Sequence, residues 1–204
     1  IRELVNTLAS FGTRNTLSGT TSTTRGIGAA RQWIFDELRR ASPKLQVSFD
    51  TYRLAKEGRI TRDVELRNVL AVLPGRSPRR IYLTAHYDTV NMGGTGQIGS
   101  NTRTAGTTPP ADPQLRADQD YDVDAPGAND NGSGTALTIE LARVLATSGI
   151  EFDATIVFAL WAGEEQGLVG SRAHAQRLDF EQTVVEANIN NGIVGNSLGG
   201  NGVV

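Results

Sequence analysis

The sequence predicts an α/β fold, a three-layer α/β/α sandwich with a mixed, mostly parallel sheet. Segments whose apolar residues keep helical spacing alternate with short apolar runs that are typical of strands. One run, 156–161, contains six apolar residues in a row, two of them β-branched, which indicates a strand buried on both faces. The 204 residues contain no internal repeat and are long enough for one sizeable core, so we expect a single domain over 1–204.

The first half of the chain contains two predicted helices and three predicted strands. A first helix is expected at 1–11 and a second at 27–41, where Ser42-Pro43 ends it. The segment 13–25 between them is rich in Thr, Ser and Gly and predicts a loop. Strands are expected at 45–54, 68–73 and 81–85.

The second half begins with a long segment, 91–125, that is rich in Gly, Thr, Asn, Asp and Pro and lacks both apolar periods. Loops of this length inside a compact domain are usually functional or disordered, so we expect an irregular loop insertion near the mouth of the site. A glycine-rich turn at 126–134 follows, and Ser133 is expected to cap the helix around 137–145. After the strand at 156, the remaining predicted elements are a helix at about 168–178 and a strand at 184–189.

Composition excludes several classes of protein. The formal net charge of −2 gives no reason to expect a nucleic acid or an anionic membrane as a partner. No stretch approaches the roughly 20 apolar residues that span a bilayer. The chain contains no cysteine, so any zinc site must use His, Asp and Glu. Because the chain begins at Ile1 and not at Met, we expect a processed or trimmed product.

Side chains of the kind that bind metals follow the predicted strands and turns. His86 and Asp88 follow the third strand, Asp130 lies in the glycine-rich turn, and Glu164 and Glu165 follow the strand at 156. Ligands of open α/β sheets bind at the carboxyl ends of strands. Taken singly, each residue is more often a surface or capping residue. Their joint placement at strand ends favours a site for Zn²⁺ or a similar divalent ion.

Three motifs in this order, AHYDTV, PGANDNGSG and ALWAGEEQGLVGS, resemble the co-catalytic zinc aminopeptidases related to glutamate carboxypeptidase and to the glutaminyl cyclases. The resemblance extends from the first helix to about residue 195 and implies the zinc exopeptidase fold. It implies that His86 is a ligand of one zinc, that Asp130 bridges two zinc ions and that Glu165 is a ligand of the second. It also implies that Glu164 is the general base and that Asp88 orients His86, as ligating imidazoles require.

The resemblance implies hydrolysis of N-terminal residues from a peptide substrate. Two zinc ions about 3.5–4 Å apart would share a water, lower its pKa and polarise the scissile carbonyl. Glu164 would take the proton of the metal-bound water and pass it to the leaving amine. Secretion is usual for such relatives, so a secreted or periplasmic location is expected.

The chain departs from this pattern in two ligands. The family supplies a second Asp, and Gly192 stands in that position; it also supplies a second His, which this chain lacks. The other histidine, His174, lies in a predicted helix and is expected at the surface. Either the chain is truncated at its C-terminus or it is a degenerate homologue, and both can hold. We therefore expect at most one weakly bound ion, at His86 and Asp130, or none.

These departures leave alternatives to a zinc aminopeptidase. A catalytically impaired homologue or fragment would act as a binding or scaffold protein. An acyl-transfer enzyme with one zinc, like the glutaminyl cyclases, ranks last because it needs the same missing ligands. The last strands and a covering helix are expected beyond Val204, so we expect self-association or a missing C-terminal segment that covers this flank.

Overall fold

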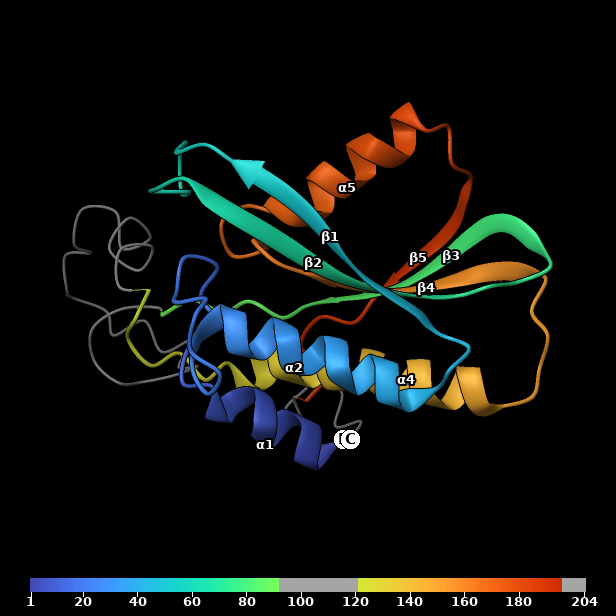
Figure 1. The fold of residues 1–204 in the computed structure, drawn as a ribbon, viewed down its shortest axis with the longest axis horizontal. Helices are drawn as coiled ribbons and strands as arrows, with labels where there is room; N and C mark the ends of the chain where they lie inside the picture. Colours follow the sequence, from blue (N-terminus) through green and yellow to red (C-terminus); the bar gives the residue numbers. More distant parts are fainter. Residues whose placement is uncertain (92–120, 196–204) are drawn as a thin grey trace, which may run out of the picture.

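The computed structural model describes residues 1–91 and 121–195, and the fold is drawn in Figure 1. Most of the expected loop insertion at 91–125 lies outside the described residues. Apart from the turn Ala128–Ser133, the helices and strands are α1 (Arg2–Ser10), α2 (Gly26–Ala41), β1 (Gln46–Leu54), β2 (Val64–Leu73), β3 (Ser77–His86), α4 (Gly134–Thr147), β4 (Ala154–Trp161), α5 (Val169–Phe180) and β5 (Val185–Asn190). The elements expected from sequence are therefore present, and β2 and β3 are longer than their apolar runs indicate.

The described strands form one mixed sheet in the order β1-β2-β4-β3-β5. β1 pairs with β2 and β2 with β4 in antiparallel fashion, whereas β3 pairs with β4 and with β5 in parallel. The expected mixed sheet is confirmed, but parallel pairs do not dominate. A hairpin joins β1 to β2, and because a hairpin reverses the chain this pair is antiparallel.

Helices cover both faces of the sheet, so the three-layer sandwich is confirmed (Figure 1). α2 and α4 lie on one face with α1 outside them, and α5 lies on the other. The central strand β4 contributes to both cores. Its residues Ile156, Phe158 and Leu160 pack among the core side chains that α2 and α4 cover, and Val157, Ala159 and Trp161 pack with Leu178 of α5. Each large side chain buried in this way stabilises the fold by about 1.5–3 kcal/mol.

The loop before α2 is well packed although its composition is polar. The hydroxyl of Ser18 accepts a hydrogen bond from the N–H of Ile27 in the first turn of α2 (2.8 Å) and so caps the helix. Gly28 lets this loop approach α2 closely, because a Cβ at that position would lie 2.5 Å from the Cα and carbonyl oxygen of Thr20. The loop is thereby fixed against the sandwich, close to the ends of β3 and β4.

The expected surface position of His174 is wrong. Its side chain lies on the face of α5 that packs on the sheet, together with Gly170 and Leu178, and only 2% of it is exposed. Residues four apart share one face of a helix, so these three positions point the same way. The partners of His174 are Asp50 on β1 (2.8 Å) and Tyr82 on β3 (3.0 Å). They are 124 and 92 residues away in sequence, so the local pattern cannot reveal them.

β5 is the edge strand beside β3, and all six of its residues are exposed. Val185 and Ile189 on the strand, and Phe180 at the end of α5, leave apolar surface uncovered on this flank. An open, apolar edge strand favours pairing with another strand. Self-association, or cover by a further segment, stays a prediction for this flank.

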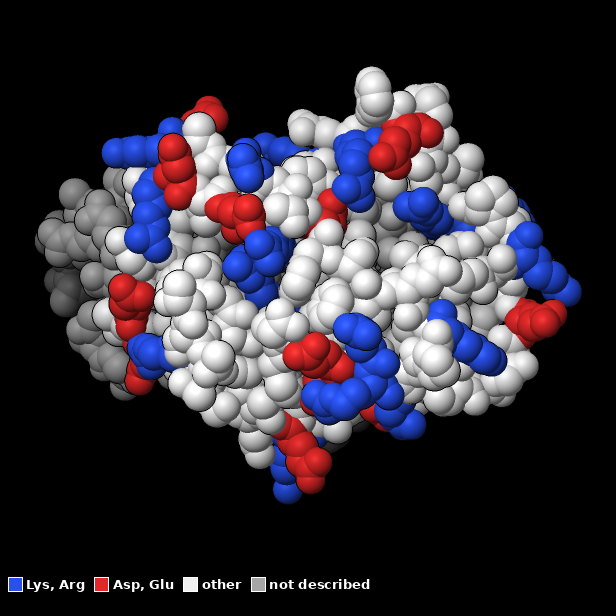
Figure 2. Space-filling model, viewed as in Figure 1, with Lys and Arg blue, Asp and Glu red and all other residues white. Residues whose placement is uncertain are grey.

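Charges on the face shown in Figure 2 are mixed in sign, with Lys and Arg interspersed among Asp and Glu. Ion pairs join Arg40 to Glu37 on α2 and Arg143 to Glu140 on α4. Exposed pairs of this kind contribute about 0–1 kcal/mol each. Among the described helices, none combines the length and apolar character needed to cross a membrane.

Candidate metal centre

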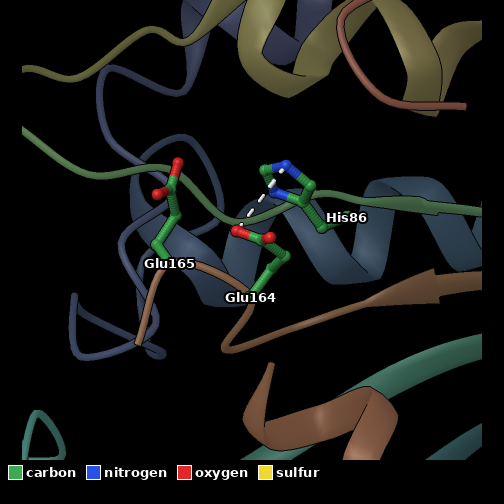
Figure 3. Close-up of side chains that lie close together, drawn as sticks. All are labelled: His86, Glu164 and Glu165. Atoms are coloured by element: carbon green, nitrogen blue, oxygen red, sulfur yellow. Dashed lines mark ion pairs between the residues drawn. The ribbon is translucent and has the colours of Figure 1, made fainter. Parts of the chain in front are cut away.

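The carboxyl ends of β3 and β4 bring three of the predicted site residues together. The two strands are parallel neighbours, and His86 pairs in register with Trp161, the last residue of β4. The turn that follows β4 therefore lies beside His86. His86, Glu164 and Glu165 each offer one ligand atom, and these atoms lie within 4.8 Å of one another (Figure 3).

Asp130 joins this group from the turn before α4. Its Oδ1 lies 3.1 Å from Nε2 of His86, and Oε2 of Glu164 lies 3.9 Å from the same nitrogen. His86 is buried, whereas half of the Asp130 side chain is exposed. One imidazole and two carboxylates thus lie close together, and Asp130 contacts the imidazole; these are donor types that zinc accepts in the absence of cysteine.

Asp88 is fully buried and connects the two strand ends. Its carboxylate accepts hydrogen bonds from the backbone N–H groups of Glu164 (3.2 Å) and Glu165 (3.1 Å) and from the hydroxyl of Thr16 (3.2 Å). Nδ1 of His86 lies 3.2 Å from the backbone oxygen of Asp88 and 3.6 Å from its Oδ1. Asp88 therefore contacts the imidazole expected to need orientation, and it also holds the Glu164–Glu165 turn.

Burial and mutual repulsion of the carboxylates change the pKa values of the groups in the site. Burial, and then the charges of Asp88 and Asp130, raise the pKa of Glu165 to about 8. Burial is also the main cause that raises the pKa of Glu164. A hydrogen bond from His86 lowers the pKa of Asp130. Burial lowers the pKa of His86, but its hydrogen bonds to Asp130 and Asp88 outweigh burial and raise it. A metal ion would therefore have to displace protons from Glu165 and His86.

A buried arginine that sequence reasoning missed lies beneath the site. Arg14 is 0% exposed and donates to the backbone oxygen of Tyr87 (2.7 Å), between His86 and Asp88. It also donates to the backbone oxygens of Leu8 (2.8 Å), Pro126 (2.6 Å) and Gly127 (3.0 Å). One side chain therefore joins α1, the segment after β3 and the turn that carries Asp130.

The charge of Arg14 persists at neutral pH. Burial lowers the pKa of Arg14 to about 10, and the charges of Asp88 and Asp130 oppose that change. Burying a charged guanidinium that donates only to neutral carbonyls costs free energy unless a negatively charged group lies near it. Asp88 and Asp130 supply this negative charge. An arginine in a Thr/Ser/Gly loop carries no signal that separates it from a surface arginine, so the sequence could not reveal it.

The predicted cap of α4 is wrong in detail. Ser133 has helical backbone angles, and its hydroxyl donates to the backbone oxygen of Asn129 (2.8 Å). The cap is Asn131, whose Oδ1 accepts the N–H of Gly134 (2.9 Å). Its amide nitrogen donates to the backbone oxygen of Asn191 (2.9 Å). Asn131 therefore also fixes the segment after β5 beside the site.

Gly192 follows the end of β5, the strand beside β3. Thr84 pairs with Asn190, the last residue of β5, and the N–H of Asn191 donates to the oxygen of Thr84 (2.7 Å), so the chain leaves the sheet close to the end of β3. The amides of Asn190 and Asn191 are engaged with the hydroxyls of Thr84 (3.1 Å) and Thr138 (3.1 Å). They replace no metal ligand in this arrangement.

The described chain thus has metal-type ligands at the carboxyl edge of an α/β/α sandwich, as the zinc exopeptidase fold implies. Comparison with known proteins agrees: the model described as peptidase family M28 matches residues 68–200. The chain belongs to peptidase family M28.

Fungal proteins are similar to this chain along almost its whole length. A probable zinc metalloprotease of Pyricularia oryzae is 40% identical over 99% of this chain and 36% of its own length. One of Leptosphaeria maculans is 39% identical over 99% of this chain and 42% of its own length. The chain therefore spans only 36% to 42% of these two relatives.

Solved structures share the fold at lower identity. LapB from Legionella pneumophila has a TM-score of 0.63 at 21% identity, over 94% of this chain and 42% of its own. Porphyromonas gingivalis glutaminyl cyclase has a TM-score of 0.67 at 20% identity, over 95% and 59%. A Zn-dependent exopeptidase from Parabacteroides distasonis has a TM-score of 0.65 at 20% identity, over 95% and 60%.

Proposed function

We propose that this chain is the metal-binding body of a zinc-dependent aminopeptidase that removes N-terminal residues from peptides. The observation that carries the proposal is the pair Glu164 and Glu165 beside His86, with ligand atoms within 4.8 Å. Two carboxylates beside one imidazole allow one to bind an ion while the other transfers protons. Membership of the M28 family supports zinc as the ion.

His86 and Asp130 would hold one zinc ion, and Asp130 and Glu165 would hold a second. Bound zinc supplies Lewis acidity, which activates water and polarises a carbonyl. Glu164 would take a proton from the attacking water and give it to the leaving amine. Partial burial raises the pKa of Glu164, which brings this carboxylate closer to the pH at which a general base works best. Asp88 holds the backbone of Glu164 and Glu165 and so fixes where that proton transfer occurs.

A second candidate function is a binding or scaffold protein that keeps the fold without turnover. Gly192 favours it, because a catalytic zinc normally has three protein ligands and each of two ions would keep two here. The two functions are distinguished by turnover in the full-length protein.

We expect the full-length protein with zinc to hydrolyse aminoacyl-arylamides at about 1 s⁻¹ or faster. A chelator should remove the activity and added Zn²⁺ should restore it. The matched control is the same substrate with an acetylated α-amine, which an aminopeptidase leaves intact. Equal cleavage of the acetylated substrate would contradict an aminopeptidase, and absence of turnover with zinc would favour the scaffold function.

We expect Gly192→Asp to raise the zinc affinity of this chain about tenfold or more, which is about 1.4 kcal/mol. The aspartate adds a third ligand and a negative charge close to the end of β3. Space exists for it, since the nearest atom to a Cβ at residue 192 is Nδ2 of Asn190 at 3.7 Å.

Calorimetric titration with Zn²⁺ measures this change. Asn188→Asp is the control, because it adds the same charge farther along exposed β5. An equal gain in both variants would mean that charge alone acts. Two tight sites in the unmodified chain, or no gain at residue 192, would contradict the assigned ligands.

A further inference from the structure

We propose that Asn68 on β2 is a positioning residue for the Glu164–Glu165 turn, and that a buried polar network around Asp50 holds Asn68 itself in place. This inference rests on the proposed roles of Glu164 and Glu165. Asn68 is 0% exposed, and it approaches the turn from the layer of the fold that α5 covers, opposite Arg14.

The backbone of the turn is held by side chains. Four consecutive N–H groups, those of residues 162–165, each donate to a side chain from a distant part of the sequence. Their acceptors are Oδ1 of Asn68 (3.1 Å), Oγ1 of Thr16 (2.9 Å) and the two carboxylate oxygens of Asp88 (3.2 and 3.1 Å). Buried N–H groups need partners, so these three side chains set where the turn lies.

Asn68 is the member of this set that also fixes the far end of the turn. Its amide nitrogen donates to the backbone oxygen of Gly170 (3.1 Å), and the N–H of Gly170 in turn donates to the oxygen of Ala162 (3.1 Å). The amide thus joins both ends of the segment that carries Glu164 and Glu165. Gly170 permits this contact, because a Cβ there would lie 2.3 Å from Oδ1 of Asn68.

A buried carboxylate orients the amide of Asn68. The nitrogen of Asn68 donates to Oδ2 of Asp50 (3.2 Å), so its oxygen must face Ala162. Asp50 is 3% exposed and is bound in addition by His174 (2.8 Å), by the hydroxyl of Tyr52 (3.0 Å) and by Arg177. Burial raises the pKa of Asp50, but hydrogen bonds from His174 and Asn68 outweigh burial and lower it. The carboxylate is therefore charged and gives the amide one orientation.

Hydrogen exchange tests the proposal without zinc or substrate, so its outcome is independent of whether the protein is a peptidase. Asn68→Ala should speed exchange of the amides of residues 162–165 by at least about tenfold beyond the change shared by the whole chain, because a buried donor loses its acceptor. Tyr82→Phe is the matched control. It removes a hydroxyl from the outer end of the same network, at His174, without touching the turn. It should change exchange uniformly or not at all.

Zinc affinity provides a second reading. Partners of metal ligands typically contribute about 10- to 100-fold to metal affinity, and we expect a loss of that order in Asn68→Ala but not in Tyr82→Phe. Uniform loss of protection in Asn68→Ala would overturn the positioning role, whereas loss confined to residues 162–165 with an unchanged zinc affinity would contradict the metal-binding role of Glu165.

A charge swap covers the case in which Asn68→Ala does not fold. Asn68→Asp keeps the acceptor for Ala162 but sets a second carboxylate beside Asp50, and it should loosen the turn by like-charge repulsion. Adding Asp50→Asn restores one charge and one amide in that pair, so the double variant should recover part of the exchange protection at residues 162–165, although the donor to Gly170 stays absent. A double variant with less protection than Asn68→Asp would overturn the proposal.

Discussion

Replacing Glu164 by glutamine is expected to lower kcat of the full-length protein about 100- to 10,000-fold, the usual contribution of a general acid–base group. Glutamine keeps the shape of the side chain but cannot take up a proton. Steady-state hydrolysis of an aminoacyl-arylamide measures the change. KM should stay close to its original value, because the substrate is bound by other groups.

Glu165→Gln is the matched control for this prediction. The two residues are neighbours in one turn, but Glu165 is assigned to the metal and Glu164 to the proton. Glu164→Gln should therefore retain the zinc affinity of the unmodified protein, whereas Glu165→Gln should lose it. Turnover unaffected by Glu164→Gln would refute the mechanism, and equal loss of zinc in both variants would refute the division of roles.

Arg14→Met is expected to destabilise the chain by about 3 kcal/mol or more, because each buried carbonyl that loses its donor costs about 1–3 kcal/mol. Arg14 donates to two buried and two partly buried oxygens, and methionine fills part of the volume without replacing a donor. Urea unfolding monitored by tryptophan fluorescence gives the free energy of unfolding.

Two further variants separate the causes. Arg14→Lys keeps the charge but cannot span the same carbonyls, so it should recover only part of the loss. Arg2→Met removes an exposed arginine from α1 and should change stability by no more than about 0.5 kcal/mol. If Arg14→Met is as stable as Arg2→Met, the hydrogen bonds of Arg14 do not stabilise the fold.

The sequence could predict those features whose signal is local. Six apolar residues in a row predict the buried strand β4, and the carboxylates directly after it predict the edge at which ligands gather. Parallel pairing of β3 with β4 then follows the usual rule for α/β sheets. His86, Glu164 and Glu165 meet for that reason, although they are 78 and 79 residues apart in number (164 − 86 and 165 − 86).

What the sequence could not predict depends on partners that are distant along the chain. The sequence places His174 in a helix and predicts a surface position, yet a buried carboxylate on β1 accepts its hydrogen bond. Arg14 and Asn68 resemble ordinary loop and strand residues until the backbone oxygens around them are known. Ser133 is a residue type that often caps helices, but the N–H of Gly134 at the start of α4 donates to Asn131 instead. Side-chain hydrogen bonds of this kind are fixed by tertiary structure.

The order of strands in the sheet has a consequence for synthesis of the chain. β3 ends at His86, and both strands that flank it, β4 and β5, come later, β4 starting 68 residues on (154 − 86). At the usual 5–20 residues per second, β3 therefore emerges roughly 3–14 s before its first partner. During that time its apolar stretch, 81–83, is open to pairing with other chains. Arg79 and Arg80 directly precede this stretch, and flanking charges of this kind oppose aggregation of an unpaired strand.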